Sequence, residues 1–244
     1  MKSLAPLSIP GIECNEESGR VVALDLGRSC LYGTINSSSN LFRLDHLRRL
    51  NLADNDFDGS QIPSNLGSLS DAQVHGIFSD RLFQLPNMQH IDLAYNSDLN
   101  GHLPKFISTS SLQMLRLRFT NFSRELPASL GNLQSLLSLD LSSAHFEGSL
   151  PQSIGNLHSL NYLNIEICSF SGSIPSSFSN LTELTYLNVD SNQFSAAKLE
   201  SLSWLWKLAK VKRLNLKSVN LLGEIPSSSE ICPDLCPWNW MAMG

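Results

Sequence analysis

The stretch from Leu112 to Leu133, LQMLRLRFTNFSRELPASLGNL, decides the fold of this 244-residue chain. Its opening phrase, L-x-x-L-x-L, restarts at Leu136, Leu160 and Leu184, each time 24 residues after the last. A repeat of this length, with apolar residues at fixed positions, cannot bury its apolar face alone and must stack on copies of itself. The sequence therefore predicts a solenoid, and we expect its function to lie on a repeated surface.

The same phrase begins four more times outside the regular stretch, at Val21, Leu47, Met88 and Val211. Apolar residues alternate with other residues in each copy, which is typical of a short strand with one buried face. Successive copies run in the same direction and return through crossovers, so we expect parallel pairing. The eight predicted strands contain the pairs Leu24/Leu26, Leu50/Leu52, Ile91/Leu93, Leu115/Leu117, Leu139/Leu141, Leu163/Ile165, Leu187/Val189 and Leu214/Leu216.

These copies resemble the plant-type leucine-rich repeat, LxxLxLxxNxLxGxIPxxLGxL, over about residues 20–230. Residues 25–57, DLGRSCLYGTINSSSNLFRLDHLRRLNLADNDF, are similar to the first repeats of plant receptor-like proteins, which are cell-surface immune receptors. The resemblance implies an α/β solenoid of right-handed curvature, with a parallel concave β-sheet and a mostly irregular or 3-10 convex side. It also implies that the chain binds a protein or peptide ligand in plant defence and is not an enzyme.

The resemblance further implies a co-receptor kinase as signalling partner and a location at the extracellular face of the plasma membrane. Residues 1–10 contain too few apolar residues for an export signal, which needs a run of about 7 to 15. The sequence has no run of about 20 apolar residues, so we expect no membrane span in this chain. Three N-x-[ST] sequons, at Asn36, Asn121 and Asn180, are predicted glycosylation sites and fit an extracellular setting.

We divide the chain into a remnant of an N-terminal cap (residues 1–20), about eight repeats (21–230, with an irregular segment at 70–87) and a non-repeat tail (231–244). In the family, a disulfide-bonded cap ends in the phrase G-[VI]-x-C. Residues 11–14, GIEC, match this phrase, but the upstream cysteines of the cap are missing. A solenoid without caps exposes its core at both ends. We therefore expect both ends to fray.

The irregular segment follows from the spacing of the repeats, because 41 residues separate Leu47 from Met88. One interpretation is that a deletion removed a strand between two repeats, and the other is an ordinary loop excursion. Under either interpretation we expect a strained parallel ladder between Leu52 and Leu93.

A buried polar position follows each predicted strand. In the family this position is Asn, whose amide bonds the backbone of neighbouring turns and satisfies groups that would cost about 1 to 3 kcal/mol each if left unpaired. In this chain the position is occupied by Ser29, Asn55, Asn96, Thr120, Ala144, Cys168, Asn192 and Val219. Ala144 and Val219 cannot make such bonds, so we expect their turns to rely on water or backbone.

The cysteines do not predict a metal or catalytic site. Cys232 and Cys236 form a single pair without further ligands, so a local disulfide or two free thiols is expected rather than zinc. We expect Cys30 and Cys168 to pack in or near the core as small residues. The six His residues show no ligand or triad spacing. We therefore predict no metal, no cofactor and no catalytic residues.

The charge balance argues against a nucleic-acid partner. The chain has 17 Lys and Arg against 22 Asp and Glu, a net charge of −5. Binding phosphates requires a clustered cationic surface, which this balance does not provide.

The predicted ligand-binding site is the concave face, where side chains between and beside the core leucines align in columns. Most of these positions carry Asp, Asn or small residues. Aromatic and Arg side chains dominate interface energetics, so departures toward them mark candidate contacts. The predicted ligand-binding residues are Tyr95, Arg116, Arg118, Phe119, Tyr162, Glu166, Tyr186 and Asp190.

Three functional hypotheses remain open from the sequence. The first is a ligand-binding module of a plant receptor-like protein. The second is an inhibitor of a pathogen cell-wall-degrading enzyme, which would need intact disulfide caps. The third is a non-functional product of a truncated gene.

Overall fold

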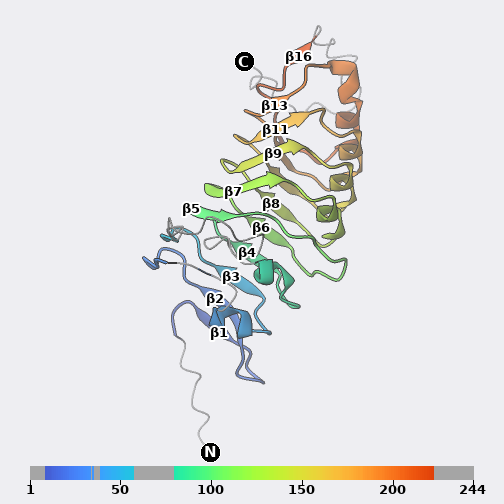
Figure 1. Ribbon diagram of the computed structural model, residues 1–244. Helices are drawn as coiled ribbons and strands as arrows, with labels where there is room; N and C mark the ends of the chain where they lie inside the picture. The colour runs from blue at the N-terminus through green and yellow to red at the C-terminus, as the bar shows by residue number, and fades with distance from the viewer. Residues whose placement is uncertain (1–8, 34, 36–38, 58–79, 223–244) are drawn as a thin grey trace, which may run out of the picture.

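The computed structural model describes residues 9–33, 35, 39–57 and 80–222, which form a curved solenoid (Figure 1). A nine-stranded sheet runs the length of the solenoid in the order β1-β2-β3-β4-β6-β8-β10-β12-β15. All eight strands predicted from the repeats are confirmed. Their bounds are β2 (Val21–Asp25), β3 (Arg49–Asn51), β4 (His90–Asp92), β6 (Met114–Arg116), β8 (Ser138–Asp140), β10 (Tyr162–Asn164), β12 (Tyr186–Asn188) and β15 (Arg213–Asn215).

The ninth strand, β1 (Ile12–Cys14), lies in the region taken from sequence as a cap remnant. It pairs antiparallel with β2 and covers the first edge of the parallel sheet. Gly11 makes the approach possible, because its φ is +82° and a Cβ there would collide with the carbonyl oxygen of Asp25. The backbone N–H of Asp25 donates to Gly11 at 2.6 Å. The N-terminal edge of the sheet is therefore covered without any disulfide in the described residues.

The expected strain in the ladder between Leu52 and Leu93 is wrong. β3 pairs directly with β4 in the regular register, with Leu50 opposite Ile91. The N–H of Leu52 donates to the carbonyl of Asp92 at 2.9 Å, as its counterparts do in the regular repeats. Extra chain between two repeats need not disturb the ladder, because the strands that pair are fixed by their own core leucines. Most of the irregular segment lies outside the described residues.

A second parallel sheet runs beside the first, in the order β13-β11-β9-β7-β5. It faces the viewer in Figure 1 and was not predicted from the sequence. Four of its strands place a phenylalanine in the core: Phe122, Phe146 and Phe170 are fully buried, and Phe194 nearly so, whereas the first strand places Leu99 there. The strand bounds are β5 (Asn96–Gly101), β7 (Thr120–Glu125), β9 (His145–Ser149), β11 (Ser169–Gly172) and β13 (Gln193–Phe194), while β14 (Ala197–Lys198) and β16 (Leu221–Leu222) form a separate pair.

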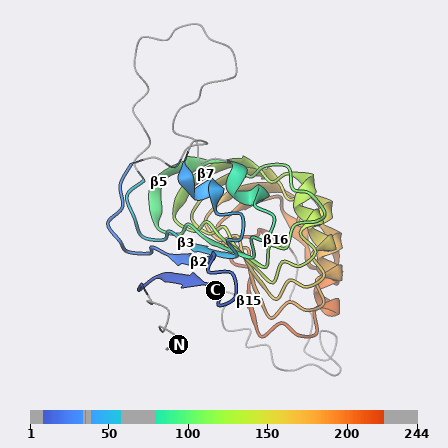
Figure 2. The same ribbon diagram turned by 90° about the horizontal axis from the view of Figure 1, so that it is seen from below.

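Short 3-10 helices cover the remaining side, as expected for a plant-type repeat, and Figure 2 shows those from residue 128 onward stacked on one flank. Three of them begin directly after prolines with extended backbone: Pro127, Pro151 and Pro175. Proline suits this place because its φ is fixed near the value found here and because no backbone N–H is needed before the helix begins. The helices are η1 (Asn40–Arg43), η2 (Asp80–Gln84), η3 (Ala128–Asn132), η4 (Gln152–Asn156), η5 (Ser176–Asn180) and η6 (Leu199–Lys207).

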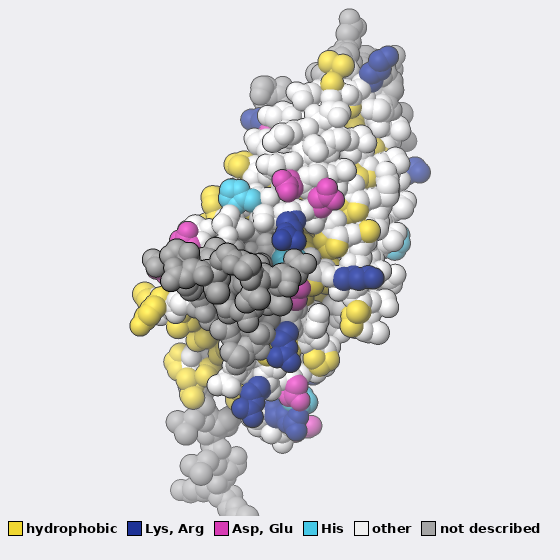
Figure 3. Space-filling model, in the orientation of Figure 1, with side chains coloured by type: hydrophobic (Ala, Val, Ile, Leu, Met, Phe, Trp, Pro, Cys, Tyr) yellow, Lys and Arg dark blue, Asp and Glu magenta, His cyan; other side chains and the backbone are white. Residues whose placement is uncertain are grey.

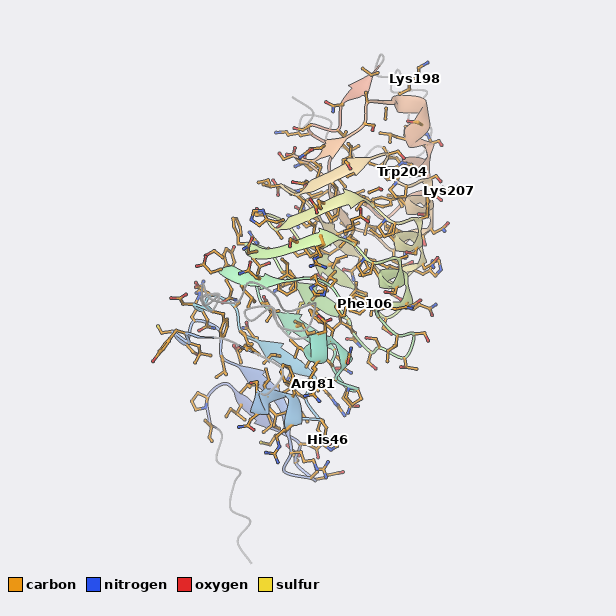
Figure 4. All side chains as sticks on the ribbon, in the orientation of Figure 1. His46, Arg81, Phe106, Lys198, Trp204 and Lys207 are labelled. Carbon is orange, nitrogen blue, oxygen red and sulfur yellow. The ribbon has the colours of Figure 1, made fainter. Side chains whose placement is uncertain are left out.

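η6 closes the described helical flank with a buried tryptophan. Trp204, labelled in Figure 4, is 3% exposed and meets the ring of Phe178 edge-on, at 5.2 Å between centroids. The apolar flank therefore continues from η5 into the last described repeat.

At the polar position after each strand, the asparagine amides bond backbone carbonyls of neighbouring turns, as predicted. The amide nitrogen of Asn96 donates to three carbonyls, those of Leu52, Leu93 and Ala94. Asn55 and Asn192 bond their turns in the same way. The Cys168 thiol donates to the Leu141 carbonyl at 3.2 Å.

The expectation of a packed thiol is wrong for Cys30, which is exposed with a positive φ of 52°. Ser29, expected at the buried position just before it, is exposed as well, so this first turn lies at the surface. Cys168, at the buried position itself, is partly buried and packs against the core.

Candidate ligand-binding face

The concave sheet carries a hollow of about 580 Å³ that spans the strands from β2 to β10. Parallel register aligns the outward side chains of neighbouring strands in columns, for example Asp92, Arg116 and Asp140. Four of the predicted ligand-binding residues line this hollow: Tyr95, Arg116, Arg118 and Tyr162.

A first aromatic cluster stands at the end of β4 and β6. The rings of Tyr95 and Phe119 stack at 5.2 Å between centroids, only 11° from parallel, and both side chains are about half exposed. The Arg118 guanidinium lies over both rings, 4.9 Å from the Tyr95 centroid and 5.3 Å from that of Phe119. A cation over aromatic faces is an attractive arrangement that fixes all three side chains.

The backbone explains why these rings point outward. Tyr95 and Phe119 have positive φ values of 59° and 52°, the left-handed conformation that ends each concave strand. The equivalent residues of the other repeats share it, and none of the set is buried. The full set is Arg28, Asp54, Tyr95, Phe119, Ser143, Ile167, Ser191 and Ser218.

A second aromatic cluster lies where β10 and β12 begin, at the opposite end of the strands from the first cluster. Tyr162 and Tyr186 stack at 4.5 Å, and Arg213 of β15 lies 5.1 Å over the Tyr186 ring. Burial raises the pKa of Tyr162 to about 12, and the charge of Asp140 adds to the shift.

Glu166 and Asp190 are on the same face but are not part of the hollow's lining. The amide of Asn188 donates to Glu166 at 2.8 Å, and that of Asn215 donates to Asp190 at 3.3 Å. Of the eight predicted residues, six therefore fall in the hollow or the two stacks. Glu166 and Asp190 instead bond the asparagines of the following strands, next to the hollow.

Sequence reasoning missed several charged residues of the hollow. Arg28 pairs with Asp54 at 3.0 Å, and Arg116 pairs with Asp92 at 3.3 Å. Asp140 is only 3% exposed, and both the backbone N–H and the hydroxyl of Ser142 donate to its Oδ1. Asp92 and Asp140 occupy the column between the core leucines that was read as family background, so column membership is the signal that identifies them.

The remaining predicted sites differ in accessibility. Asn180 is exposed at the end of η5, whereas Asn121 is half-buried in β7 with its amide donating to Asn100. Asn36 lies outside the described residues. On the face seen in Figure 3, Lys and Arg side chains alternate with Asp and Glu rather than gathering in one basic area.

Two classes of site are absent from the part of the chain that the structure describes. No group of three or more His, Cys, Asp or Glu side chains there is arranged to hold a metal ion. None of the described helices has the length and apolar character needed to cross a bilayer.

Comparison with known proteins identifies the repeat family. The family description "Leucine-rich repeat region" matches residues 81–224, and "Leucine Rich Repeat" matches residues 46–69. Receptor-like protein 6 of Arabidopsis thaliana is 35% identical over 147 residues, covering 53% of this chain and 15% of its own length. Receptor-like protein Cf-9 of Solanum pimpinellifolium is 28% identical over 219 residues, covering 55% of this chain and 25% of its own length. The chain thus spans a quarter or less of these two relatives.

Solved structures agree with the fold. The Arabidopsis receptor kinase HAESA, in complex with the peptide hormone IDA and the co-receptor SERK1, matches with a TM-score of 0.69 and 26% identity over 91% of this chain and 38% of that one. The PEPR1–AtPEP1 structure matches with a TM-score of 0.67 and 28% identity over 80% of this chain and 24% of that one. Stacked parallel strands, 3-10 helices and matching relatives together establish that this chain belongs to the leucine-rich repeat family and is related to the plant receptor-like proteins.

Proposed function

We propose that this chain supplies the recognition surface of a plant receptor-like protein and that its concave face binds a protein or peptide ligand. The observation that carries the proposal is the hollow of about 580 Å³ flanked by two stacked aromatic pairs, each with an arginine over a ring. Rigid aromatic and Arg side chains contribute most of the binding free energy at protein interfaces. The ordered stacks lower the entropy that these side chains lose on binding.

The proposal extends to partners and location. One similar structure holds a receptor kinase together with a peptide hormone and a co-receptor, so a co-receptor kinase is the signalling partner proposed for this chain. The relatives are receptor-like proteins, which supports a place at the extracellular face of the plasma membrane. The exposed sequon at Asn180 is the glycosylation site that fits this location best.

The test selects peptide binders and then replaces side chains on the concave face and on the helical flank in separate variants. A random dodecapeptide display library is panned on the full chain, and the selected peptides are synthesised. Replacing Arg118 and Phe119 together by Ala should weaken these peptides by at least about thirtyfold, corresponding to about 2 kcal/mol.

The matched control replaces two residues of the helical flank, Gln152 and Ser176, by Ala. This pair should change affinity by less than about twofold, because neither residue belongs to the concave sheet. Equal losses from the two double variants, or no peptides retained by the chain, would overturn the proposal.

A further inference from the structure

We infer that the hollow contains a subsite for a positively charged side chain of the ligand, centred on Asp140 of β8. The inference rests on the proposed function and adds the chemistry that the ligand must present. Three observations support it: the depth of the concave face over β8, the ion pairs among the residues that line the hollow, and the burial of one carboxylate.

The concave face is deepest over β8 because the side chains there are short. β8 and the two residues after Leu141 present only short polar groups, those of Ser138, Asp140, Ser142 and Ser143. The neighbouring strands present long ones, which belong to Arg116 and Arg118 on one side and Tyr162 on the other. β8 therefore lies at the bottom of a trough, and Ser138, Asp140 and Tyr162 all line the hollow.

The ionic pairing of the hollow leaves a negative surplus. Its lining includes four carboxylates (Asp25, Asp54, Asp92 and Asp140) and three guanidinium groups (Arg28, Arg116 and Arg118). Two ion pairs use Arg28 and Arg116, on Asp54 and Asp92 respectively. Among the described residues neither of the other two carboxylates has an ion-pair partner, while Arg118 is held over two aromatic rings.

Asp140 is the acid for which a ligand cation matters most. Asp25 is exposed to solvent, whereas Asp140 is 3% exposed and has little contact with water. Both of its hydrogen bonds within the described residues come from Ser142 and end on Oδ1, which leaves Oδ2 free to accept. A buried carboxylate without a counterion is unfavourable, and a cation that shares its low-dielectric site interacts strongly with it.

The neighbouring groups favour an ammonium or guanidinium over an anion. Tyr162 feels the charge of Asp140, which adds to the burial that raises its pKa to about 12. Tyr162 lines the hollow together with Asp140, so a ligand cation at Asp140 would also lie beside the aromatic ring. Arg118 turns one face of its guanidinium to Tyr95 and Phe119, and its Nε is buried without a hydrogen-bond partner, so an anion could not reach that nitrogen without displacing the stack.

The experiment uses the dodecapeptide pool selected on the full chain. Lys and Arg should be enriched in selected peptides at least about twofold over the unselected library. The Asp140→Asn variant keeps an oxygen that can accept from Ser142 but removes the charge, and it should weaken the peptides about tenfold. The matched control, Glu147→Gln, removes an exposed carboxylate from β9 of the second sheet and should change affinity less than twofold.

A change on the peptide side completes the test. Replacing the enriched Arg of a peptide by its neutral isostere citrulline should cost about tenfold on the wild-type chain and almost nothing on Asp140→Asn. Ser138→Lys places a cation in the trough from the chain itself and should also abolish the preference for basic peptides. Thermal unfolding followed by circular dichroism confirms that each variant is folded.

The outcomes separate the two proposals. Peptides that need Arg118 and Phe119, yet show no basic enrichment or enrichment in Asp and Glu, would overturn the cationic subsite and leave the concave site standing. Equal citrulline losses on wild-type and Asp140→Asn chains would overturn it as well. Peptides that tolerate the concave double variant would overturn the proposed function itself.

Discussion

The turn at Asn96 and the turn at Ala144 have the same backbone but different support. The residue before each is left-handed, with φ of 59° at Tyr95 and 55° at Ser143. Each of these two residues also donates its N–H to the next repeat, at 2.9 Å and 2.8 Å. Asn96 adds three side-chain bonds, whereas Ala144 can add none. Stacking on the next repeat therefore sets the shape of the turn, and the asparagine contributes stability.

The largest expected effect breaks the better-supported turn. Asn96→Ala leaves the buried carbonyls of Leu52 and Leu93 without their side-chain donor. We expect a loss of about 3 kcal/mol in the free energy of unfolding, because each buried group left unpaired costs about 1 to 3 kcal/mol. Urea titration of both proteins measures the difference.

The control for this substitution is the adjacent Ser97→Ala, at an exposed position of the same turn, which should stay within about 0.5 kcal/mol of wild type. If Asn96→Ala loses less than about 1 kcal/mol, stacking alone supports this turn as it does at Ala144.

An effect of intermediate size tests the turn at Cys168. Burial raises the pKa of its thiol from 9.0 to about 12, and a hydrogen bond from the backbone of Ala144 offsets part of the shift. The folded state therefore holds the thiol proton more tightly than the unfolded state. This contribution to stability is complete below pH 9 and is lost as the pH rises from 9 toward 12.

Between pH 8 and pH 11 the wild-type chain should lose about 2 kcal/mol more unfolding free energy than Cys168→Ala. Comparing the two proteins cancels the titration of lysines and tyrosines that they share. Parallel pH profiles would show that the thiol is not protected in the fold.

The smallest expected effect sharpens the comparison by adding what one turn lacks. Ala144→Asn places an amide where its counterparts bond the carbonyl three residues earlier and that of the previous repeat, here those of Leu141 and Leu117. We expect a gain of about 1 kcal/mol in the free energy of unfolding, near the usual net value of a buried hydrogen bond. Destabilisation would mean that the space around Ala144, which is 4% exposed, cannot accept the larger side chain.

The regular parts of the fold were predictable because each repeat states its pattern in the sequence. The spacing of the core leucines predicted the eight parallel strands of the concave sheet, and the side chains at Ala144 and Asn192 predicted which turns would have amide bonds. The second sheet was missed because strands such as β9 have one buried residue, Phe146, between exposed neighbours. So short an alternation does not distinguish a strand from a loop.

The candidate site was predictable by column but not by contact. Tyr162 and Tyr186 share a column, so their stacking follows from the register. Arg118 over Tyr95 joins different columns, and that contact depends on side-chain rotamers that the sequence does not specify. Asp140 was overlooked because its chemical type is common in its column, whereas its burial and its lack of an ion-pair partner among the described residues are visible only in the structure.

The left-handed residue at the end of each concave strand has an evolutionary consequence. Every described repeat keeps a side chain there rather than glycine, although that conformation costs a non-glycine residue about 1 to 2 kcal/mol. The position is already strained and is not buried, so exchanging one side chain for another leaves the scaffold nearly unchanged. Single codon changes at these sites can therefore alter the shape and charge of the concave surface one repeat at a time while the fold stays under constant selection.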